Sequence, residues 1–535
     1  MRKPTAASKV AAVSRRWMVL VGLLVVALAG GAYLLARSDE PKQQAAVDDP
    51  LAEALAFAPA ASPVVAQFDV QRGSQQGNAL RDLARTFPAA RFAADGVRQA
   101  VRGLGLDADA DLPSILGGPV IVAGPASAAR GLSASITSLQ LDLPAIVRAG
   151  ATAAVIGRSA DDVAAVLDRA TSDGRLRKLP DVGTDIQQYA LPEDAARLGV
   201  RDGAVVLARD AQTLERAYAL HDNKGGLTRA TFDERLGPLV HTPALIRATA
   251  QPRALISPKA QGVPWVDALR SGSLAIAIEK PGVRLRVHLS TDAAKLKPTD
   301  LPIAPGAQPP RPAPGTRPIN VAVRDIGQTI DVLNATKDGL HLPFLKPLQD
   351  ALATLDSLKG PLKTFGRIDV DALIDQLTGT TTITPEATND TLALRTELTD
   401  GGPLRTALNR LVAIPDIALD LAGVGLNVDR KGDTYTITKD DKIFAKAAVL
   451  GKTLVITNDL KVSLRGIADR APQAAPSRGA LAFHVGGTAL QDQLVTRLGL
   501  PDLARLVIGG FGGVDGTARA ELGGVDLDAT LELND

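Results

Sequence analysis

The chain has no cysteine, few aromatic residues and almost no net charge. Without cysteine it can form no disulfide, thiolate metal site or thiol nucleophile. Its 10 Phe, 4 Tyr and 2 Trp among 535 residues are too few for stacking platforms that bind bases or sugars. A net charge of +2 excludes the broad basic field that nucleic acid needs. What remains is a globular chain, 45% hydrophobic and 22% charged, with room for two or three domains.

One long uncharged run lies near the N-terminus. Residues 17–36 read WMVLVGLLVVALAGGAYLLA, and as a helix this run covers the roughly 30 Å hydrocarbon core of a bilayer. Basic residues precede it without acidic ones, and acidic residues follow it closely. This asymmetry predicts a single-pass signal anchor in the cell membrane, with residues 1–16 cytoplasmic and the bulk extracytoplasmic. The alternative is a cleaved signal peptide, for which small residues are present at Ala27, Ala29 and Ala32.

A proline-rich segment interrupts the middle of the chain. Eight prolines fall between Pro298 and Pro318, a density that favours extended polyproline II over helix or central strand. The segment therefore predicts an interdomain linker. The expected organisation is a basic tail over 1–16, a transmembrane helix over 17–36, a polar linker over 37–53, a first domain over 54–292, a proline-rich linker over 293–315 and a second domain over 316–535.

The two halves repeat one plan. Five segment pairs occur in the same order at similar offsets, each pair matching in its alternation of strand, turn and capped helix. The matched pairs are 62–70 with 317–325, 153–170 with 392–412, 202–220 with 450–468, 243–255 with 479–490, and 283–289 with 525–531. The expected helix caps are Ser159, Asp210, Asn458 and either Thr399 or Asp400. This order predicts an internal duplication.

Each half reads as an α+β domain. Hairpins recur, and in the last strand of each half apolar and polar residues alternate, as over 283–289. No strand opens into a glycine-rich phosphate loop, which disfavours a doubly wound parallel sheet. The prediction is two duplicated domains with antiparallel sheets, helices packed mainly on one face and the other face partly solvated, preceded by the transmembrane helix.

The opening of the first half resembles a known family. SPVVAQFDVQRGSQQGNALRDLARTFP and the later VRQAVRGLGLDADADLPSILGGPVIVAG are similar to bacterial membrane-anchored proteins of domain of unknown function 3352. The likeness covers roughly residues 51–292 and departs from the family pattern at SQQGNAL. It implies an uncharacterised extracytoplasmic protein and brings no catalytic residues with it. The positions that fit are Asp69, Gly73, Gln75, Phe87, Pro88, Leu116 and Gly117.

Three motifs resemble known functional or structural motifs, but none of them is a strong indication of a chemical site. DADAD over 107–111 carries the alternate acids of a calcium loop, but Leu112 and Gly118 stand where the loop needs Gly and Glu, which favours a polar turn. GKT over 451–453 lacks the first glycine of a phosphate loop, so a hairpin turn is expected. The glycine-rich stretch 508–516 indicates a flexible strand edge or a bend.

The sequence contains no pattern typical of a catalytic or metal site. The five histidines do not occur at ligand spacing, and GxSxG, SxxK and HExxH are absent. We therefore expect no catalytic, cofactor-binding or metal residue, and a non-enzymatic envelope protein that binds or scaffolds an envelope protein, lipid or polymer, along the space between the two sheets. The alternative is an envelope hydrolase with a Ser/His/Asp site assembled between the domains. The histidines are His221, His241, His288, His341 and His484.

Overall fold

The computed structural model describes the chain in segments and divides it into two compact units. The first unit draws on residues 19–255 and 270–289, and the second on residues 256–269 and 290–532. The predicted anchor at 17–36 lies outside the described residues, and no described helix is long and apolar enough to cross a membrane. The described residues are 47–69, 74–86, 101–128, 143–183, 185–256, 262–279, 282–305, 319–336, 356, 359–364, 366–385, 391–413, 426–439, 442–469, 480–487 and 511–533.

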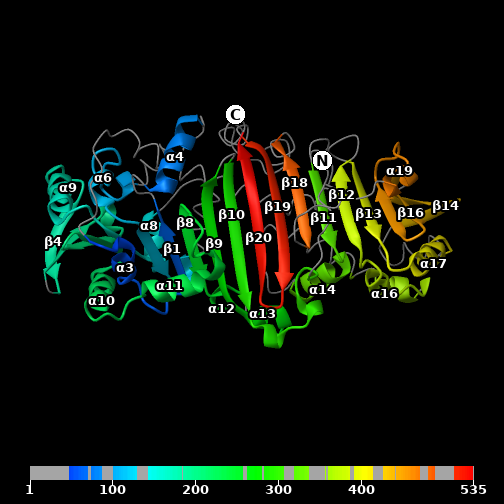
Figure 1. Ribbon diagram of the computed structural model, residues 1–535, viewed down its shortest axis with the longest axis horizontal. Coiled ribbons are helices and arrows are strands. Elements are labelled where there is room, and N and C mark those ends of the chain that lie inside the picture. The colour runs from blue at the N-terminus through cyan, green and yellow to red at the C-terminus, as the bar shows by residue number, and fades with distance from the viewer. Residues whose placement is uncertain are drawn as a thin grey trace. The chain divides into compact units, whose positions relative to one another are not determined.

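The first unit is built on an antiparallel sheet with the strand order β4-β5-β6-β7-β3-β2-β1-β8-β9-β10 (Figure 1). Its strands are β1 Val64–Phe68, β2 Val120–Gly124, β3 Thr152–Ile156, β4 Arg177–Val182, β5 Ile186–Ala190, β6 Arg197–Arg201, β7 Ala204–Ala208, β8 Ile246–Ala250, β9 Leu269–Glu279 and β10 Gly282–Thr291. Its α-helices are α3 Pro50–Leu55, α4 Gln75–Thr86, α6 Leu112–Ile115, α8 Leu143–Arg148, α9 Ala160–Ser172, α10 Ala211–Asp222, α11 Arg229–Leu236 and α12 Pro252–Leu255. Single 3₁₀ turns lie at Pro192–Asp194 and Gly237–Leu239.

The second unit has the strand order β14-β15-β16-β17-β13-β12-β11-β18-β19-β20. Its strands are β11 Ile319–Arg324, β12 Thr380–Pro385, β13 Leu392–Glu397, β14 Leu426–Lys431, β15 Thr434–Lys439, β16 Lys442–Leu450, β17 Thr453–Thr457, β18 Leu481–Gly486, β19 Phe511–Glu521 and β20 Gly524–Leu533. Its α-helices are α13 Pro264–Ala268, α14 Ile326–Thr336, α16 Val370–Ile374, α17 Gly401–Val412 and α19 Leu464–Ala468. Strand by strand, this order repeats that of the first unit, which is the arrangement that an internal duplication predicts.

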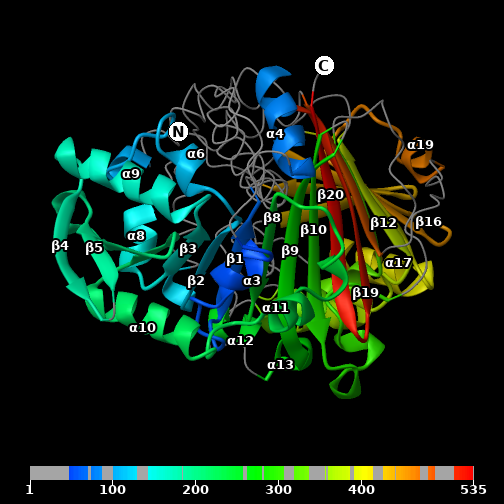
Figure 2. The ribbon, with the colours of Figure 1, turned by 60° about the vertical axis from the view of Figure 1, so that its left-hand side comes forward.

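Helices cover both faces of the sheet in the first unit, so the prediction of helices mainly on one face is wrong there. On one face α3 packs on β2 and β3, α10 on β6 and β7, and α11 on β8 (Figure 2). On the other face α9 buries Val163, Val166 and Leu167 against the sheet. The reason lies in strands such as β7, AVVLA, whose five residues are all buried. A continuous apolar run needs cover on both sides, whereas an alternating strand needs it on one.

The predicted helix caps are mostly confirmed. Ser159 accepts a hydrogen bond from the Asp162 amide at 3.1 Å, and Asp400 is the residue that caps α17. The prediction of Asn458 as a cap is wrong: Ser463 caps α19. Asn458 instead accepts a hydrogen bond from the Leu392 amide at 2.6 Å, so its side chain ties β17 to β13.

The first part of the proline-rich segment is packed against the second unit. Residues 293–295 and 298–300 form 3₁₀ turns rather than polyproline II. Leu296 and Leu301 are buried with Ala268 and Ala520, and the Gln328 side chain donates to the carbonyls of Pro298 and Leu301 at 2.8 Å. Apolar residues between the prolines therefore anchor this stretch. Residues 306–318 lie outside the described residues, and the domain boundaries stay a prediction.

Candidate functional site

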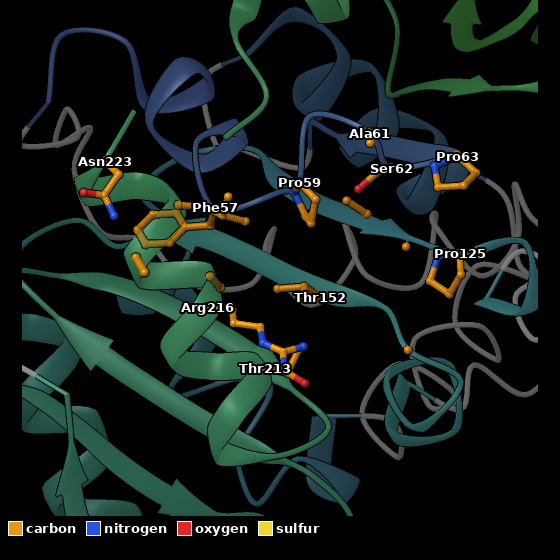
Figure 3. A pocket seen from close by; sticks show the side chains of 16 residues that line it. Phe57, Pro59, Ala61, Ser62, Pro63, Pro125, Thr152, Thr213, Arg216 and Asn223 are labelled. Atoms are coloured by element: carbon orange, nitrogen blue, oxygen red, sulfur yellow. The ribbon is translucent and has the colours of Figure 1, made fainter. Parts of the chain in front are cut away.

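A cavity of about 590 Å³ opens in the first unit, within the range typical of small-molecule sites. Its floor is formed by the ends of β2 and β3, one wall by α10, and the opposite wall by the segment that joins α3 to β1 (Figure 3). Most of its sixteen lining residues are apolar or small. They are Phe57, Pro59, Ala61, Ser62, Pro63, Ala123, Gly124, Pro125, Gly150, Thr152, Thr213, Arg216, Ala217, Ala219, Leu220 and Asn223.

The wall between α3 and β1 is held by backbone contacts. Pro59 forms an isolated antiparallel bridge with Gly226, and the Leu227 amide donates to the Ala58 carbonyl at 2.8 Å. A Cβ atom at Gly226 would lie 1.8 Å from the Ala56 carbonyl oxygen, so only glycine permits this approach. The segment thus runs tightly beside the turn that follows α10, which fixes Phe57 at the cavity.

Aromatic packing orients Phe57. Its ring stacks on His221 with centroids 4.5 Å apart and an interplanar angle of 11°, and it meets Tyr218 edge-on at 5.1 Å. His221 Nε2 lies 2.6 Å from Glu53 Oε1, which joins α10 to α3. The Tyr218 hydroxyl donates to the Ala204 carbonyl at 3.0 Å, and burial raises its pKa. The cavity wall is therefore a rigid cluster of rings rather than a single loose side chain.

The start of α10 is fixed by Asp210. This carboxylate accepts from the Thr213 amide at 2.7 Å and pairs with Arg209 at 2.8 Å. Partial burial acts to raise the pKa of Asp210, but the hydrogen bonds from Thr213 and the charge of Arg209 outweigh it and lower the pKa. At the far end, the Arg201 guanidinium donates to Asp222 and holds the pKa of that carboxyl below its usual value. Charged groups therefore stabilise both ends of α10, the helix that forms one wall of the cavity.

Arg216 is the one ionisable side chain among the sixteen lining residues, and it is exposed. Two hydroxyl groups face the same space from buried positions, because Ser62 is 4% and Thr152 8% exposed. The lining contains no His, Asp or Glu. A serine hydroxyl without an adjacent base is a poor nucleophile, so this geometry is suited to binding rather than to acyl transfer.

The acidic run at 107–111 is a polar turn closed by its own carboxylates. Asp107 accepts from the amides of Asp109 and Ala110 at 2.9 Å. The fully buried Asp111 accepts from the Asp107 amide at 2.7 Å and from Arg175 and Arg169 at 2.9 and 3.3 Å. Because two guanidinium groups occupy its carboxylate, Asp111 is a structural anchor for α9 and has no oxygen facing a cation site.

The other two motifs are structural as well. Gly451 and Lys452 form the hairpin turn between β16 and β17, as predicted, with Gly451 at φ +61°. The described part of the 508–516 stretch belongs to β19, which pairs with β18 and β20, so the prediction of a strand edge or bend is wrong there. Gly516 lies opposite Phe483, and a Cβ at that position would come within 2.2 Å of the ring. The glycine makes room for an aromatic side chain.

The four described histidines lie in separate places. His221 packs behind Phe57, His288 lies on β10, and His241 is exposed. His484 Nδ1 lies 2.9 Å from Asp515 Oδ1 on the neighbouring strand, and this hydrogen bond raises its pKa. His341 lies outside the described residues. Within the part of the chain that the structure describes, no three His, Asp or Glu side chains gather in a way that could hold a metal ion.

Comparisons with known proteins give little beyond this geometry. No family model matches the chain, and no curated protein matches it. Among solved structures, crystal form I of TP0453 is similar with 9% identity and a TM-score of 0.27, covering 47% of this chain and 82% of that one. Crystal form III of TP0453 gives a TM-score of 0.26. A likeness at this level carries no argument about fold or function.

No sequence pattern indicates the cavity directly. Its lining comes from Phe57, Thr152 and Arg216, which lie far apart in the chain and on unrelated motifs. The nearest local signal is the run APAASP over 58–63, whose prolines and small residues leave an extended segment with little side-chain volume. Binding along the space between the two sheets, and the alternative of a hydrolase site between the domains, stay predictions.

Proposed function

We propose that this chain is a non-enzymatic binding protein of the bacterial cell envelope, anchored through residues 17–36 with its bulk outside the membrane. The uncharged run, its basic flank and the resemblance to membrane-anchored proteins support the location. The observation that carries the binding role is the apolar cavity of the first unit, framed by Phe57 and α10. A concave, mostly apolar space of this size with a few polar groups is the usual form of a small-molecule site.

Hydrolysis is the less favoured reading because the cavity lacks the groups that it needs. Ser62, Thr152 and Thr213 line the space, but the lining contains no His, Asp or Glu that could act as their general base. Thr213 is already bonded to Asp210. The nearest histidine, His221, is stacked on Phe57 and paired with Glu53. The polar groups thus orient a ligand rather than attack it.

The binding role is tested by photolabelling the full chain in phosphatidylcholine nanodiscs with an alkyl diazirine. We expect labelled peptides to cluster in residues 57–63 and 211–223. Ala219→Trp, which places a large ring in the cavity from an exposed position, abolishes that labelling. Glu215→Trp, on an exposed position of α10 outside the lining, is the matched control and leaves it unchanged. The proposal is contradicted if Ala219→Trp leaves the labelling unchanged. It is also contradicted by reproducible turnover of envelope lipid, peptide or glycan.

The anchor is tested separately by external protease on intact spheroplasts. The protease should remove everything beyond about residue 40 and spare the basic tail. A soluble secreted form that begins near Gly31 would show a signal peptide instead.

A further inference from the structure

Arg216 differs from the arginines near it in having no partner among the residues that the structure describes. Arg209 pairs with Asp210, Arg201 with Asp222, and Arg235 donates to the carbonyls of Ala60 and Ser62. No hydrogen bond or ion pair joins Arg216 to any described residue. A guanidinium at the edge of an apolar cavity is thus available to an incoming group.

The cavity separates this charge from an apolar interior. In Figure 3, Arg216 and Thr213 lie on one wall and Ser62 on the opposite wall, with Thr152 on the floor between them. Apart from the charge, most of the lining is Phe57, Leu220, prolines and small residues, and the uncharged polar groups are those of Ser62, Thr152, Thr213 and Asn223. A ligand that fits this pattern has one charged end and one hydrocarbon body.

Resting on the binding role proposed above, we infer that the cavity takes a single-chain amphiphile with one anionic group, of the fatty-acid type. Its chain lies against Phe57 and Leu220, and its carboxylate accepts hydrogen bonds from Arg216. The planar guanidinium fork matches a carboxylate in two parallel hydrogen bonds. Each methylene buried in the cavity adds roughly 0.8 kcal/mol of hydrophobic free energy. With a single cation in the lining, a second anionic group on the ligand would be unpaired.

The inference is tested with three ten-carbon competitors of the photolabel: decanoate, methyl decanoate and decyltrimethylammonium. The full chain in neutral phosphatidylcholine nanodiscs should release the label to decanoate at about fivefold lower concentration than to the methyl ester, and to the cation last, because the arginine repels it. Arg216→Gln should bring decanoate to the level of the ester without changing the ester itself. Lys178→Gln, the same charge change on the exposed edge strand β4, should leave the order intact.

The outcomes separate the two claims. If the three competitors act equally in the wild type, or if Arg216→Gln leaves the preference for decanoate in place, the anionic ligand is wrong while the apolar cavity stands as a binding site. If no label enters the cavity and Ala219→Trp has no effect, the binding role fails and this inference with it. A melting temperature of Arg216→Gln within 2 °C of wild type, as expected for an exposed side chain, shows that folding is not the cause.

Discussion

His221 Nε2 and Glu53 Oε1 lie 2.6 Å apart, although 168 positions separate the two residues in the chain. The pair joins α10 to α3 directly behind Phe57, whose ring is stacked on the imidazole. Since Phe57 lines the cavity, the position of this cavity wall depends on the contact between His221 and Glu53. The contact is partly exposed, with side-chain exposures of 26% for His221 and 40% for Glu53, so its value lies in orientation more than in stability.

Breaking this pair should weaken ligand binding more than it weakens the fold. Glu53→Gln and His221→Gln are each expected to raise the half-saturating concentration of the photolabel about threefold, because Phe57 loses its support. The double variant should be no weaker than the worse single one, as for residues that act together. Titration of photolabelling measures this, and fully additive losses would show that the two residues act independently.

Asp111 should be essential to the first unit, because its carboxylate is fully buried between Arg169 and Arg175. Asp111→Asn leaves two guanidinium groups with a neutral partner and should cost about 3 kcal/mol of unfolding free energy. Asp109→Asn, an exposed neighbour in the same turn, is the control and should change it by less than about 0.5 kcal/mol.

Urea unfolding followed by protection of α9 amides from hydrogen exchange measures both variants. Equal loss in the two would mean that the turn as a whole, rather than the buried ion pairs, stabilises α9. Added calcium should leave both unfolding curves unchanged, since the Asp111 carboxylate is occupied by arginines.

The His484–Asp515 pair should make the second unit more stable in mild acid. The hydrogen bond to Asp515 raises the pKa of His484 above 6.5, with burial opposing it and the charge of Glu532 adding to it. A raised pKa means that the folded state binds the proton more tightly. The stabilisation is therefore complete below pH 6.5 and is lost as pH rises through the folded-state pKa.

Melting curves of wild type and Asp515→Asn across pH 5 to 9 test this linkage. Asp515→Asn should melt below wild type at pH 5.5, and the gap should shrink as the pH rises. A gap that is independent of pH would show that the pair contributes through packing alone.

Thr249→Val should stabilise the first unit. The Thr249 side chain is 2% exposed, and its hydroxyl has no hydrogen-bond partner among the described residues. Valine has the same shape without the unpaired group, so a gain of about 1 kcal/mol is expected. Thr381→Val is the matched contrast, because the Thr381 hydroxyl donates to Thr396 at 3.1 Å, and it should lose about that amount. Denaturation midpoints would refute the argument if both changes had the same sign.

Local patterns in the sequence predicted local structure well. Ser159 and Asp210 cap the expected helices because a cap depends on the next three residues alone. Antiparallel strands and the GKT hairpin followed from alternation and turn residues. The prediction that Asn458 caps a helix was wrong. Whether its side chain caps a helix or bonds to a neighbouring strand depends on Leu392, which lies 66 positions away in the chain.

Local sequence patterns did not predict how distant segments pack together. Burial of both sheet faces depends on α3 and α9 arriving from different parts of the chain, although the all-apolar β7 is consistent with it. The cavity is a gap between Phe57, Thr152 and Arg216, and no periodicity marks a space that side chains leave empty. Sequence patterns indicate which residues are buried. A cavity, in contrast, depends on the space that the packed side chains leave empty.

The most direct measurement is a crystal structure of the protein soaked with 10-bromodecanoate, located by the anomalous signal of bromine. The account predicts a single strong bromine peak inside the cavity beside Phe57, with the carboxylate density at Arg216. Ala219→Trp crystals should lack the peak. A cavity without bromine at saturating ligand, or peaks confined to other surfaces, would contradict the claim that this protein is a binding protein built around that cavity.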